Sequence, residues 1–264
     1  MGLTDGPAWY GRRVAEAEAN GDDHAVEATQ RIGERLAYLR SQRNLKISDL
    51  ARRIGVSPSL ISQIERGQSR PSVTTLFALA QALSVPVDAF FESGPLTELE
   101  PAGGATADPR GRAMGESIGT LARVRAESAR RAADGMREGE RYLLKHDERP
   151  TVEIRGGVRW ERLTRTALND LEFMELVYEP GAESDPQLYR HPGLECVVVI
   201  ENRLDITIGF EVNQVMAGDS IAFPSSLPHR YVNPTSEVSR AITVILRDDL
   251  SALPPIAGPA EPVE

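Results

Sequence analysis

Residues 50–67 read LARRIGVSPSLISQIERG, and this stretch predicts two short helices joined by a tight turn. The first helix is expected to end at Gly55, because glycine readily takes the left-handed conformation found just past a helix end. Ser57 and Pro58 then supply a hydroxyl N-cap and a proline at the first helical position. Isoleucines three residues apart give the second helix one buried face. The stretch is therefore predicted to be a helix-turn-helix.

Helical periodicity extends outward from this stretch in both directions. Ile32, Leu36 and Leu39 recur at helical spacing and predict a longer helix before it. After it, Ser72 is placed to cap a fourth helix, and residues 87–91 predict a fifth, short one. We therefore expect an all-α, five-helix domain over residues 29–92, preceded by an acidic extension over residues 1–28.

Charge is distributed very unevenly along the chain. The whole chain has a net charge of −9, which by itself argues against a nucleic-acid partner. Residues 29–75, however, contain nine basic and three acidic residues, a net charge of +6 that leaves −15 for the remainder. A local excess of positive charge in an acidic protein favours a polyanion site in the helical domain.

The helical region resembles the phage-repressor-like (XRE) transcriptional regulators over about sixty residues. The resemblance implies that the helix opened by Ser57 enters the major groove of double-stranded operator DNA. Ser59, Ser62 and Gln63 would then read base edges, since glutamine can bond adenine bidentately and serine can donate or accept. Contacts to phosphates would give affinity rather than specificity. The candidates for these contacts are Arg43, Lys46, Arg52, Arg66 and Arg70.

Two positions in this region have other interpretations. In the XRE family the acid at the position of Glu65 pairs with an arginine late in the first helix, here Arg40, so we interpret both residues as structural. The family often places glutamine at the start of the second helix to grip a phosphate, and this chain has Ile47 there. One anchoring contact is therefore expected to be missing.

The periodicity changes after the helical domain. Residues 93–141 begin with a stretch rich in Gly, Pro and Ala that predicts a linker, followed by an Arg- and Ala-rich segment, 116–133, with helical character. Short strands punctuated by turns follow, which predicts an all-β domain over residues 142–250 and a flexible tail over residues 251–264. The expected strands are 142–145, 158–163, 171–178, 194–200, 204–208, 220–223, 230–232 and 240–246.

Two motifs in this region resemble the cupin superfamily. GDSIAFPSSLPHRYVN, residues 218–233, matches the pattern G-x5-P-x-G-x2-H-x3-N, with Ser226 in place of the second glycine. YRHPGLE, residues 189–195, matches the pattern H-x-H-x3,4-E in part, with Tyr189 in place of the first histidine. The resemblance implies an α+β, two-domain chain: the helix-turn-helix domain, then a cupin barrel of the double-stranded β-helix or jelly-roll type.

Carried over by position, the cupin motifs bring His191, Glu195 and His229 together inside the barrel, with Tyr189 at the fourth ligand position. Two imidazoles and one carboxylate suit Fe(II), and Zn, Mn or Ni are also compatible. The alternative is a metal-free pocket in which Glu195 and His229 bind an organic effector or each other. Trp160, Phe173, Phe210, Phe223 and Tyr231 are further candidates for lining the pocket or for packing.

Two classes of function follow from these motifs. The first is a dimeric transcriptional regulator whose barrel binds a small-molecule or metal effector and whose barrel edge forms the dimer. The second is a mononuclear non-haem iron oxygenase, because an iron-dependent epoxidase of phosphonate antibiotic biosynthesis pairs a similar helical domain with a cupin. The basic window and the capped recognition helix favour the regulator, and we expect no catalytic residue. A single cysteine and the lack of long apolar runs predict a cytoplasmic protein without membrane contact.

Overall fold

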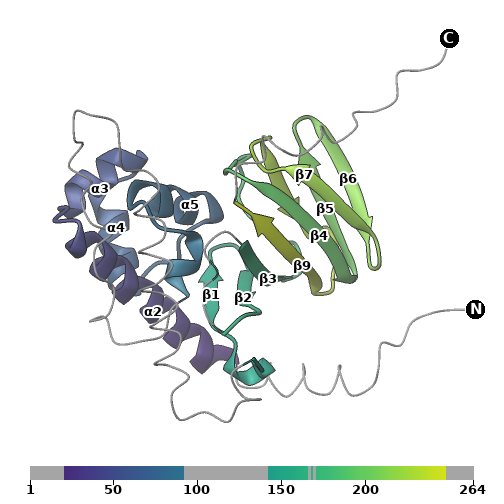
Figure 1. Cartoon of the computed structure of the whole chain (residues 1–264), viewed down its shortest axis with the longest axis horizontal. Helices are drawn as coiled ribbons and strands as arrows, with labels where there is room; N and C mark the ends of the chain where they lie inside the picture. The colour runs from purple at the N-terminus through teal and green to yellow at the C-terminus, as the bar shows by residue number, and fades with distance from the viewer. Residues whose placement is uncertain (1–20, 92–141, 166–167, 169–170, 248–264) are drawn as a thin grey trace, which may run out of the picture.

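Helices and strands occupy separate parts of the computed structural model, which describes residues 21–91, 142–165, 168 and 171–247 (Figure 1). The helical part, called the head below, contains α2 (Gly21–Gln42), α3 (Ile47–Ile54), α4 (Pro58–Glu65), α5 (Val73–Ala82) and the 3₁₀ helix η1 (Val87–Phe90). The predicted linker, the Arg- and Ala-rich segment and the tail lie outside the described residues. None of the helices in the described part of the chain is long and apolar enough to cross a membrane.

The helix boundaries in the head follow the local signals in the sequence. Gly55 ends α3 in the left-handed conformation, with φ of 73°. Ser57 caps α4 by accepting a hydrogen bond from the Leu60 N–H, and Ser72 caps α5 by accepting one from Thr75. Buried apolar residues from all four helices then form the core of the head. Local capping and apolar periodicity thus predict the order of these helices correctly.

Two predictions about the head are corrected. The fifth helix is a short 3₁₀ helix, whose turns close with hydrogen bonds from Ala89 N–H to Pro86 O and from Phe91 N–H to Asp88 O. Four residues after a proline are too few to build α-helical bonding, and the three-residue spacing of a 3₁₀ turn suits so short a piece. The first helix begins at Gly21, so it also takes up residues that we assigned to the acidic extension.

Close contact between α2 and α4 depends on a glycine. A Cβ atom at Gly33 of α2 would lie 2.4 Å from the carbonyl oxygen of Ile64 and 2.8 Å from that of Glu65, both on α4. These atoms belong to the backbone and cannot rotate away. The absence of a side chain at Gly33 therefore lets the first helix support the last turn of α4.

Nine strands of the described residues form two antiparallel sheets. The order in the larger sheet is β1-β2-β3-β9-β4-β7, and in the smaller it is β6-β5-β8. A short 3₁₀ helix, η3 (His146–Glu148), precedes them. We call the two sheets together the barrel. The strands are β1 (Thr151–Ile154), β2 (Val158–Arg162), β3 (Leu171–Tyr178), β4 (Leu194–Glu201), β5 (Arg203–Ile208), β6 (Glu211–Met216), β7 (Ser220–Pro224), β8 (His229–Val232) and β9 (Ser239–Leu246).

One predicted strand is absent from the structure, and two strands were missed. Residues 142–145 form no strand, whereas β1 and β6 were not predicted. Tyr142 and Leu143 are exposed and have no neighbouring strand, so their alternation reflected no buried face. Strand β6 lies at the edge of the smaller sheet and exposes most of its residues, so its sequence lacks the apolar alternation of a half-buried strand.

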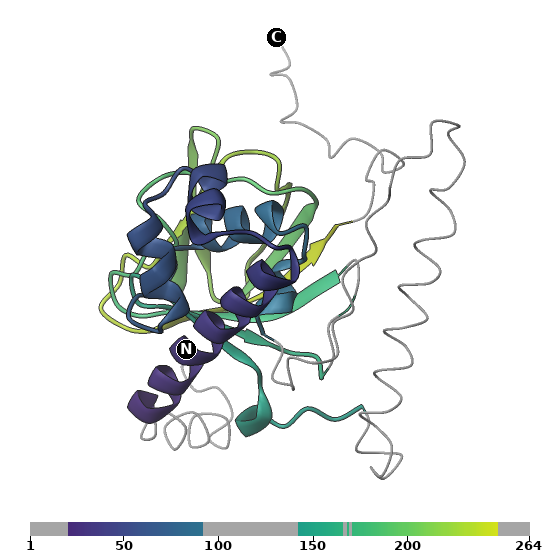
Figure 2. The same cartoon turned by 90° about the vertical axis from the view of Figure 1, so that its left-hand side faces the viewer.

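The head rests on the first hairpin of the barrel, β1–β2, at both ends of α5 (Figure 2). Before α5, the Arg155 N–H donates to Pro71 O at 2.9 Å. After α5, a buried ion pair joins Asp88 of the head to Arg162 of β2, with 3.2 Å between Oδ1 and Nη1. These contacts hold α5 against the barrel.

Candidate functional site

Helix α4 presents a polar side to solvent. Its apolar side, Ile61 and Ile64, is fully buried in the head. Ser59 and Gln63 are exposed, and Ser62 is half-buried. The three predicted base-reading residues therefore lie on the same short helix, outside the core, and two of them are fully accessible to a groove.

Arg66 lies over the end of α4 and contacts one of these residues. Its Nη1 donates a hydrogen bond to Ser62 Oγ, and its Nε donates to Gln68 Oε1 at 3.1 Å. Ser62 is thus already engaged by a residue predicted to bind phosphate. The Gln63 side chain makes no such contact within the described part of the chain, which makes it the more available base reader.

The five predicted phosphate contacts fall into two groups. Lys46 and Arg52 are exposed near the ends of α3, and Arg52 pairs with Asp49 at 2.6 Å. Arg66 is also exposed, and half-buried Arg43 donates to Leu39 O at 3.2 Å. Arg70 differs from these, because its guanidinium lies between Thr29 of the head and Glu153 of β1.

The distances from Arg70 are 3.2 Å to Thr29 Oγ1 and 3.5 Å to Glu153 Oε2. We therefore interpret Arg70 as a contact between the head and the barrel.

Glu65 and Arg40 form the pair expected from the XRE pattern. Arg40 Nε lies 2.5 Å from Glu65 Oε1 and Nη2 lies 2.9 Å from Oε2, which is a bidentate arrangement. Arg40 Nη1 also donates to Leu45 O at 2.7 Å, which ties the end of α2 to the start of α3. The hydrogen bond that Arg40 donates to Glu65 raises the pKa of Arg40. The predicted pairing of these two residues is confirmed.

A second cluster lies inside the barrel and consists of His191, Glu195 and His229. Glu195 comes from β4, His229 from β8 and His191 from the loop before β4. All three side chains are buried, and their ligand atoms lie within 4.8 Å of one another. His191 Nε2 is 3.1 Å from Glu195 Oε2, and His229 Nε2 is 3.5 Å from the same oxygen. The predicted triad is therefore brought together.

The ring nitrogens of His229 have different roles. Nδ1 lies 2.8 Å from Leu227 O, so it carries a proton and donates to that carbonyl. Nε2 is buried and has no hydrogen-bond partner in the described residues. Burial lowers the pKa of His229, which keeps the ring neutral. His229 thus directs a lone pair at Glu195.

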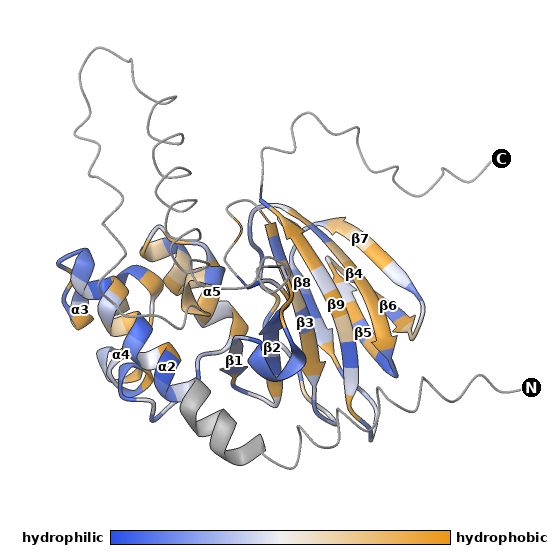
Figure 3. Ribbon diagram, turned by 60° about the horizontal axis from the view of Figure 1, so that its bottom comes forward, coloured by the Kyte–Doolittle hydropathy of each residue, from blue (hydrophilic) through white to orange (hydrophobic). Residues whose placement is uncertain are grey.

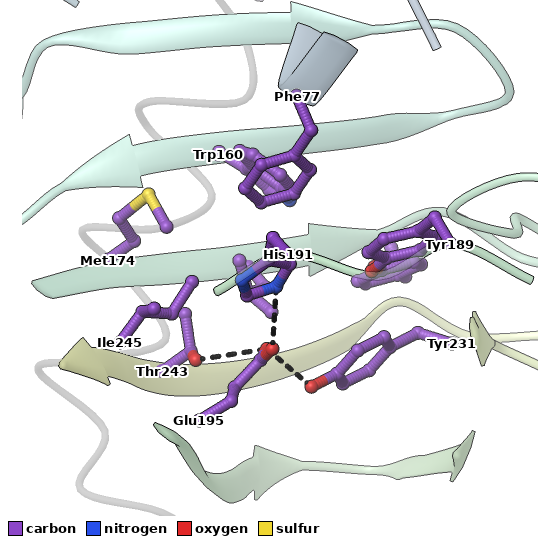
Figure 4. A pocket seen from close by; sticks show the side chains of 11 residues that line it. Phe77, Trp160, Met174, Tyr189, His191, Glu195, Tyr231, Thr243 and Ile245 are labelled. Atoms are coloured by element: carbon purple, nitrogen blue, oxygen red, sulfur yellow. Dashed lines mark hydrogen bonds and ion pairs between the residues drawn. The ribbon is translucent and has the colours of Figure 1, made fainter. Parts of the chain in front are cut away.

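Glu195 carries a negative charge in this cluster. Burial alone would raise its pKa, but hydrogen bonding and charge from His191 lower it below the ordinary value. Oε1 also accepts hydrogen bonds from Tyr231 Oη at 2.6 Å and Thr243 Oγ1 at 3.4 Å (Figure 4). An ionised carboxylate with two neighbouring imidazoles is a donor set that suits a cation.

Tyr189 lies beside the triad. Its ring is 4.4 Å from the His229 ring, and the backbones of the two residues are hydrogen-bonded to each other in both directions. Burial raises the pKa of the Tyr189 hydroxyl well above its ordinary value, so the hydroxyl stays protonated. Tyr189 also lines the cavity beside the triad.

His191 and Glu195 of the triad face a small cavity with a mostly aromatic and apolar wall, while His229 is not among its lining residues. It has about 10 Å³ of room for the centre of a water molecule, which is space for one water or one ion. Trp160 and Tyr231 line it, as their aromatic character suggested, whereas Phe210 is fully exposed at a turn. The remaining wall consists of Phe77, Met174, Leu176, Tyr178, Tyr189, Thr243 and Ile245.

Phe77 is the one lining residue that comes from the head, and sequence reasoning missed it together with five barrel residues: Met174, Leu176, Tyr178, Thr243 and Ile245. It belongs to α5 of the head, far from the cupin-like motifs, and its ring centroid lies 4.2 Å from that of His191 with only 9° between the planes (Figure 4). The available signal was a large apolar side chain on a helix whose buried face is formed by other residues. Nothing in its local pattern pointed to the barrel.

Comparisons with known proteins agree with this division. A family described as "Helix-turn-helix" matches residues 36–90, and one described as "Cupin domain" matches residues 174–245. A crystallised HTH_3 family transcriptional regulator from Vibrio cholerae has the same fold, with a TM-score of 0.51 and 19% identity, over 85% of this chain and 99% of that one. The fold is thus a DNA-binding helix-turn-helix domain joined to a cupin domain.

Sequence relatives then identify the family. The HTH-type transcriptional regulator SutR of Escherichia coli is 25% identical over 198 residues, which are 75% of this chain and 84% of that protein. An uncharacterized HTH-type regulator, y4dJ, of Sinorhizobium fredii is 41% identical over 54 residues, 20% of this chain and 70% of that protein. The chain belongs to the HTH-type transcriptional regulators, in the XRE group with a cupin domain, and is a DNA-binding regulator.

Proposed function

We propose that the DNA affinity of this regulator is controlled by a divalent metal ion held by His191, Glu195 and His229. The buried, unpartnered Nε2 of His229 is the observation that carries the proposal. A buried acceptor without a partner is costly, and this one lies 3.5 Å from the ionised Glu195 carboxylate. A bound divalent cation supplies the positive charge that Glu195 lacks. Fe, Zn, Mn and Ni all suit this donor set.

The DNA-reading part of the proposal assigns roles within the head. Gln63 and Ser59 read base edges, with Ser62 held in place by Arg66. Lys46, Arg52, Arg43 and Arg66 contact phosphates, which gives affinity and salt dependence. Since α4 is short and reads few base pairs, the protein binds as a dimer to a two-fold operator.

The outer face of the larger sheet, next to its edge strand β7, is the dimer surface that we propose. Cross-strand pairing places Cys196 of β4 beside Val244 of β9 and Ala222 of β7, and places Val198 beside Ile242. These residues alternate with buried ones and remain partly exposed, so the face is apolar (Figure 3). Burying such a face against a second copy removes apolar surface from water. The number of protein copies bound to one DNA molecule tests whether the protein binds as a dimer.

A metal titration of DNA binding tests the central proposal. Affinity for a fragment of DNA from upstream of the protein's own gene is measured by fluorescence anisotropy, first with a chelator and then with Zn²⁺, Mn²⁺, Ni²⁺ or anaerobic Fe²⁺. We expect one metal to change the affinity and also to raise barrel stability, by about 2.7 kcal/mol at a hundred times its Kd.

Variants of the proposed ligands, and one histidine variant outside the cavity, accompany that titration. His229→Ala and Glu195→Gln should lose the metal effect, because each removes one of three ligands. His146→Ala is the matched control, since His146 lies on η3 outside the cavity. Equal DNA affinity with and without every metal would contradict the proposal.

A mononuclear non-haem iron oxygenase is the second candidate function. The set of two imidazoles and one carboxylate favours it, because such sets bind Fe(II) in oxygenases. The basic window and the capped recognition helix of the head oppose it, because an oxygenase needs neither. Oxygen consumption by the Fe²⁺-loaded protein without any change in DNA affinity would favour the enzyme.

A further inference from the structure

Phe77 is a residue of the DNA-binding head that forms part of the wall of the sensor cavity. Its neighbours Val73, Leu76 and Ala80 on α5 are buried in the core of the head. The Phe77 ring leaves that core and enters the barrel, where it stacks on His191 and meets Trp160 at 5.9 Å and 63° (Figure 4). The cavity is therefore closed partly by the domain that reads DNA.

The stacking partner of Phe77 is a residue whose bonding must change when the site is filled. His191 Nε2 lies 3.1 Å from Glu195 Oε2 and donates a hydrogen bond to this carboxylate oxygen. The same nitrogen cannot keep that hydrogen bond and also give its lone pair to a metal ion. The ring of His191, with Phe77 parallel to it at 4.2 Å, therefore differs in its hydrogen bonding between the empty and the filled site.

Helix α5 is well placed to pass such a change to the DNA-reading helix. Its two flanks are fixed to the β1–β2 hairpin by the Pro71–Arg155 hydrogen bond and the buried Asp88–Arg162 ion pair. On its other side α5 packs against α3, and α3 packs against α4. A close-packed interior transmits small displacements rather than absorbing them.

We propose that Phe77 couples the barrel site to DNA affinity, by reading the state of His191 and transmitting it through α5 and α3 to α4. This inference rests on the proposed metal-dependent function and adds the residue that connects its two sites. Coupling between two sites commonly changes affinity by about 5- to 150-fold, and it is reciprocal. DNA should therefore change the affinity for the metal by the same factor through Phe77.

Zn²⁺ is a suitable probe, because it has no redox chemistry of its own. In the wild-type protein we expect DNA affinity with Zn²⁺ to differ from that with chelator by a factor in the range given above. In Phe77→Leu, which keeps an apolar side chain but removes the ring, this ratio should fall toward one. The affinity for Zn²⁺ without DNA should stay close to that of the wild type, because the three ligands are unchanged.

Two further variants separate coupling from folding. Phe77→Tyr keeps a ring over His191 and should retain the coupling ratio. Phe223→Leu removes a different ring, one that meets His229 edge-on at 5.1 Å from within the barrel, and should also retain it. Hydrogen exchange gives a readout without DNA: Zn²⁺ should alter exchange of the α5 amides in the wild-type protein and leave it unaltered in Phe77→Leu.

The outcomes are distinct for the two proposals. If Phe77→Leu binds Zn²⁺ and keeps the full wild-type ratio, the role of Phe77 is wrong while metal control of DNA binding stands. If the wild-type protein binds DNA equally with and without Zn²⁺ and every other metal, metal control fails and the coupling fails with it. Loss of coupling in Phe223→Leu as well would assign the effect to general loosening of the site and overturn the inference.

Discussion

The head and the barrel bury very different kinds of side chain. The core of the head is mostly aliphatic and aromatic, and among its charged side chains only Arg35 and Asp88 are fully buried in the described residues. The barrel buries many ionisable groups, among them Glu172, Glu175 and Arg240 besides the triad. Burying charge usually lowers stability, even when the charge is paired. The difference indicates that the head is built for stability and for a functional surface, and the barrel for a functional interior.

The largest expected effect concerns the charged pair of the head. Removal of one partner from a buried ion pair typically lowers the free energy of unfolding by about 3–5 kcal/mol, because the other charge is left uncompensated. The side chains of Arg40 and Glu65 are 18% and 10% exposed, so Glu65→Ala should fall at the lower end of that range. Thermal unfolding followed by circular dichroism measures the change.

A surface pair in the barrel is the control for this variant. Glu148 pairs with Arg165 at 2.8 Å, but both side chains are more exposed, at 39% and 27%. Glu148→Ala should therefore change stability by less than about 1 kcal/mol. A Glu65→Ala variant that is as stable as the wild type but no longer binds DNA would show that Glu65 contacts DNA. The structural role of the Arg40–Glu65 pair would then be wrong.

A smaller effect is expected on the DNA-binding surface of the head. Gln63→Ala should reduce discrimination between operator variants by about 1–3 kcal/mol at one base position, without unfolding the domain. Arg52→Ala should weaken binding to all sequences alike and reduce the salt dependence by about one phosphate contact. Binding to a panel of single-base operator variants at several salt concentrations measures both. Equal loss on all sequences for Gln63→Ala would exclude it as a base reader.

The sequence predicted the head better than the barrel, and the reason is the range of the interactions. Helix ends depend on neighbours in the chain, such as Gly55 and Ser57, so local reading found them. The edge strand β6 depends on its pairing with β5, and its mostly exposed residues carry little periodic pattern. The predicted fifth helix failed for a similar reason, because its length rather than its composition decided the 3₁₀ form.

The barrel site was predicted through resemblance and only in part. Spacing within the two motifs placed His191, Glu195 and His229 correctly, because motif positions in a barrel converge through its fixed strand register. The protonated state of Tyr189 and the unpartnered nitrogen of His229 depend on burial and on a carbonyl from a turn. Phe77 depends on how two domains meet, which no pattern within either domain contains. Such contacts are visible only in the structure.

The smallest effect lies at the boundary between the two regions, at Glu153 of β1. Burial raises its pKa above the ordinary value of 4.5, although the charge of Arg70 from the head pulls it down. The folded state therefore holds this proton more tightly than the unfolded state does. The free energy of unfolding therefore falls as the pH rises from about 4.5 through the raised pKa, and it stays lower at neutral pH.

Glu153→Gln removes the titrating group and so isolates this contribution. The variant should match the wild type at and below the ordinary pKa and become the more stable protein at neutral pH, by less than about 1 kcal/mol. Urea unfolding at a series of pH values measures the difference. A wild type that is more stable than Glu153→Gln at neutral pH would mean that the attraction of Arg70 outweighs burial. In that case charge would stabilise the boundary between the head and the barrel at Glu153 as well as at the Asp88–Arg162 pair.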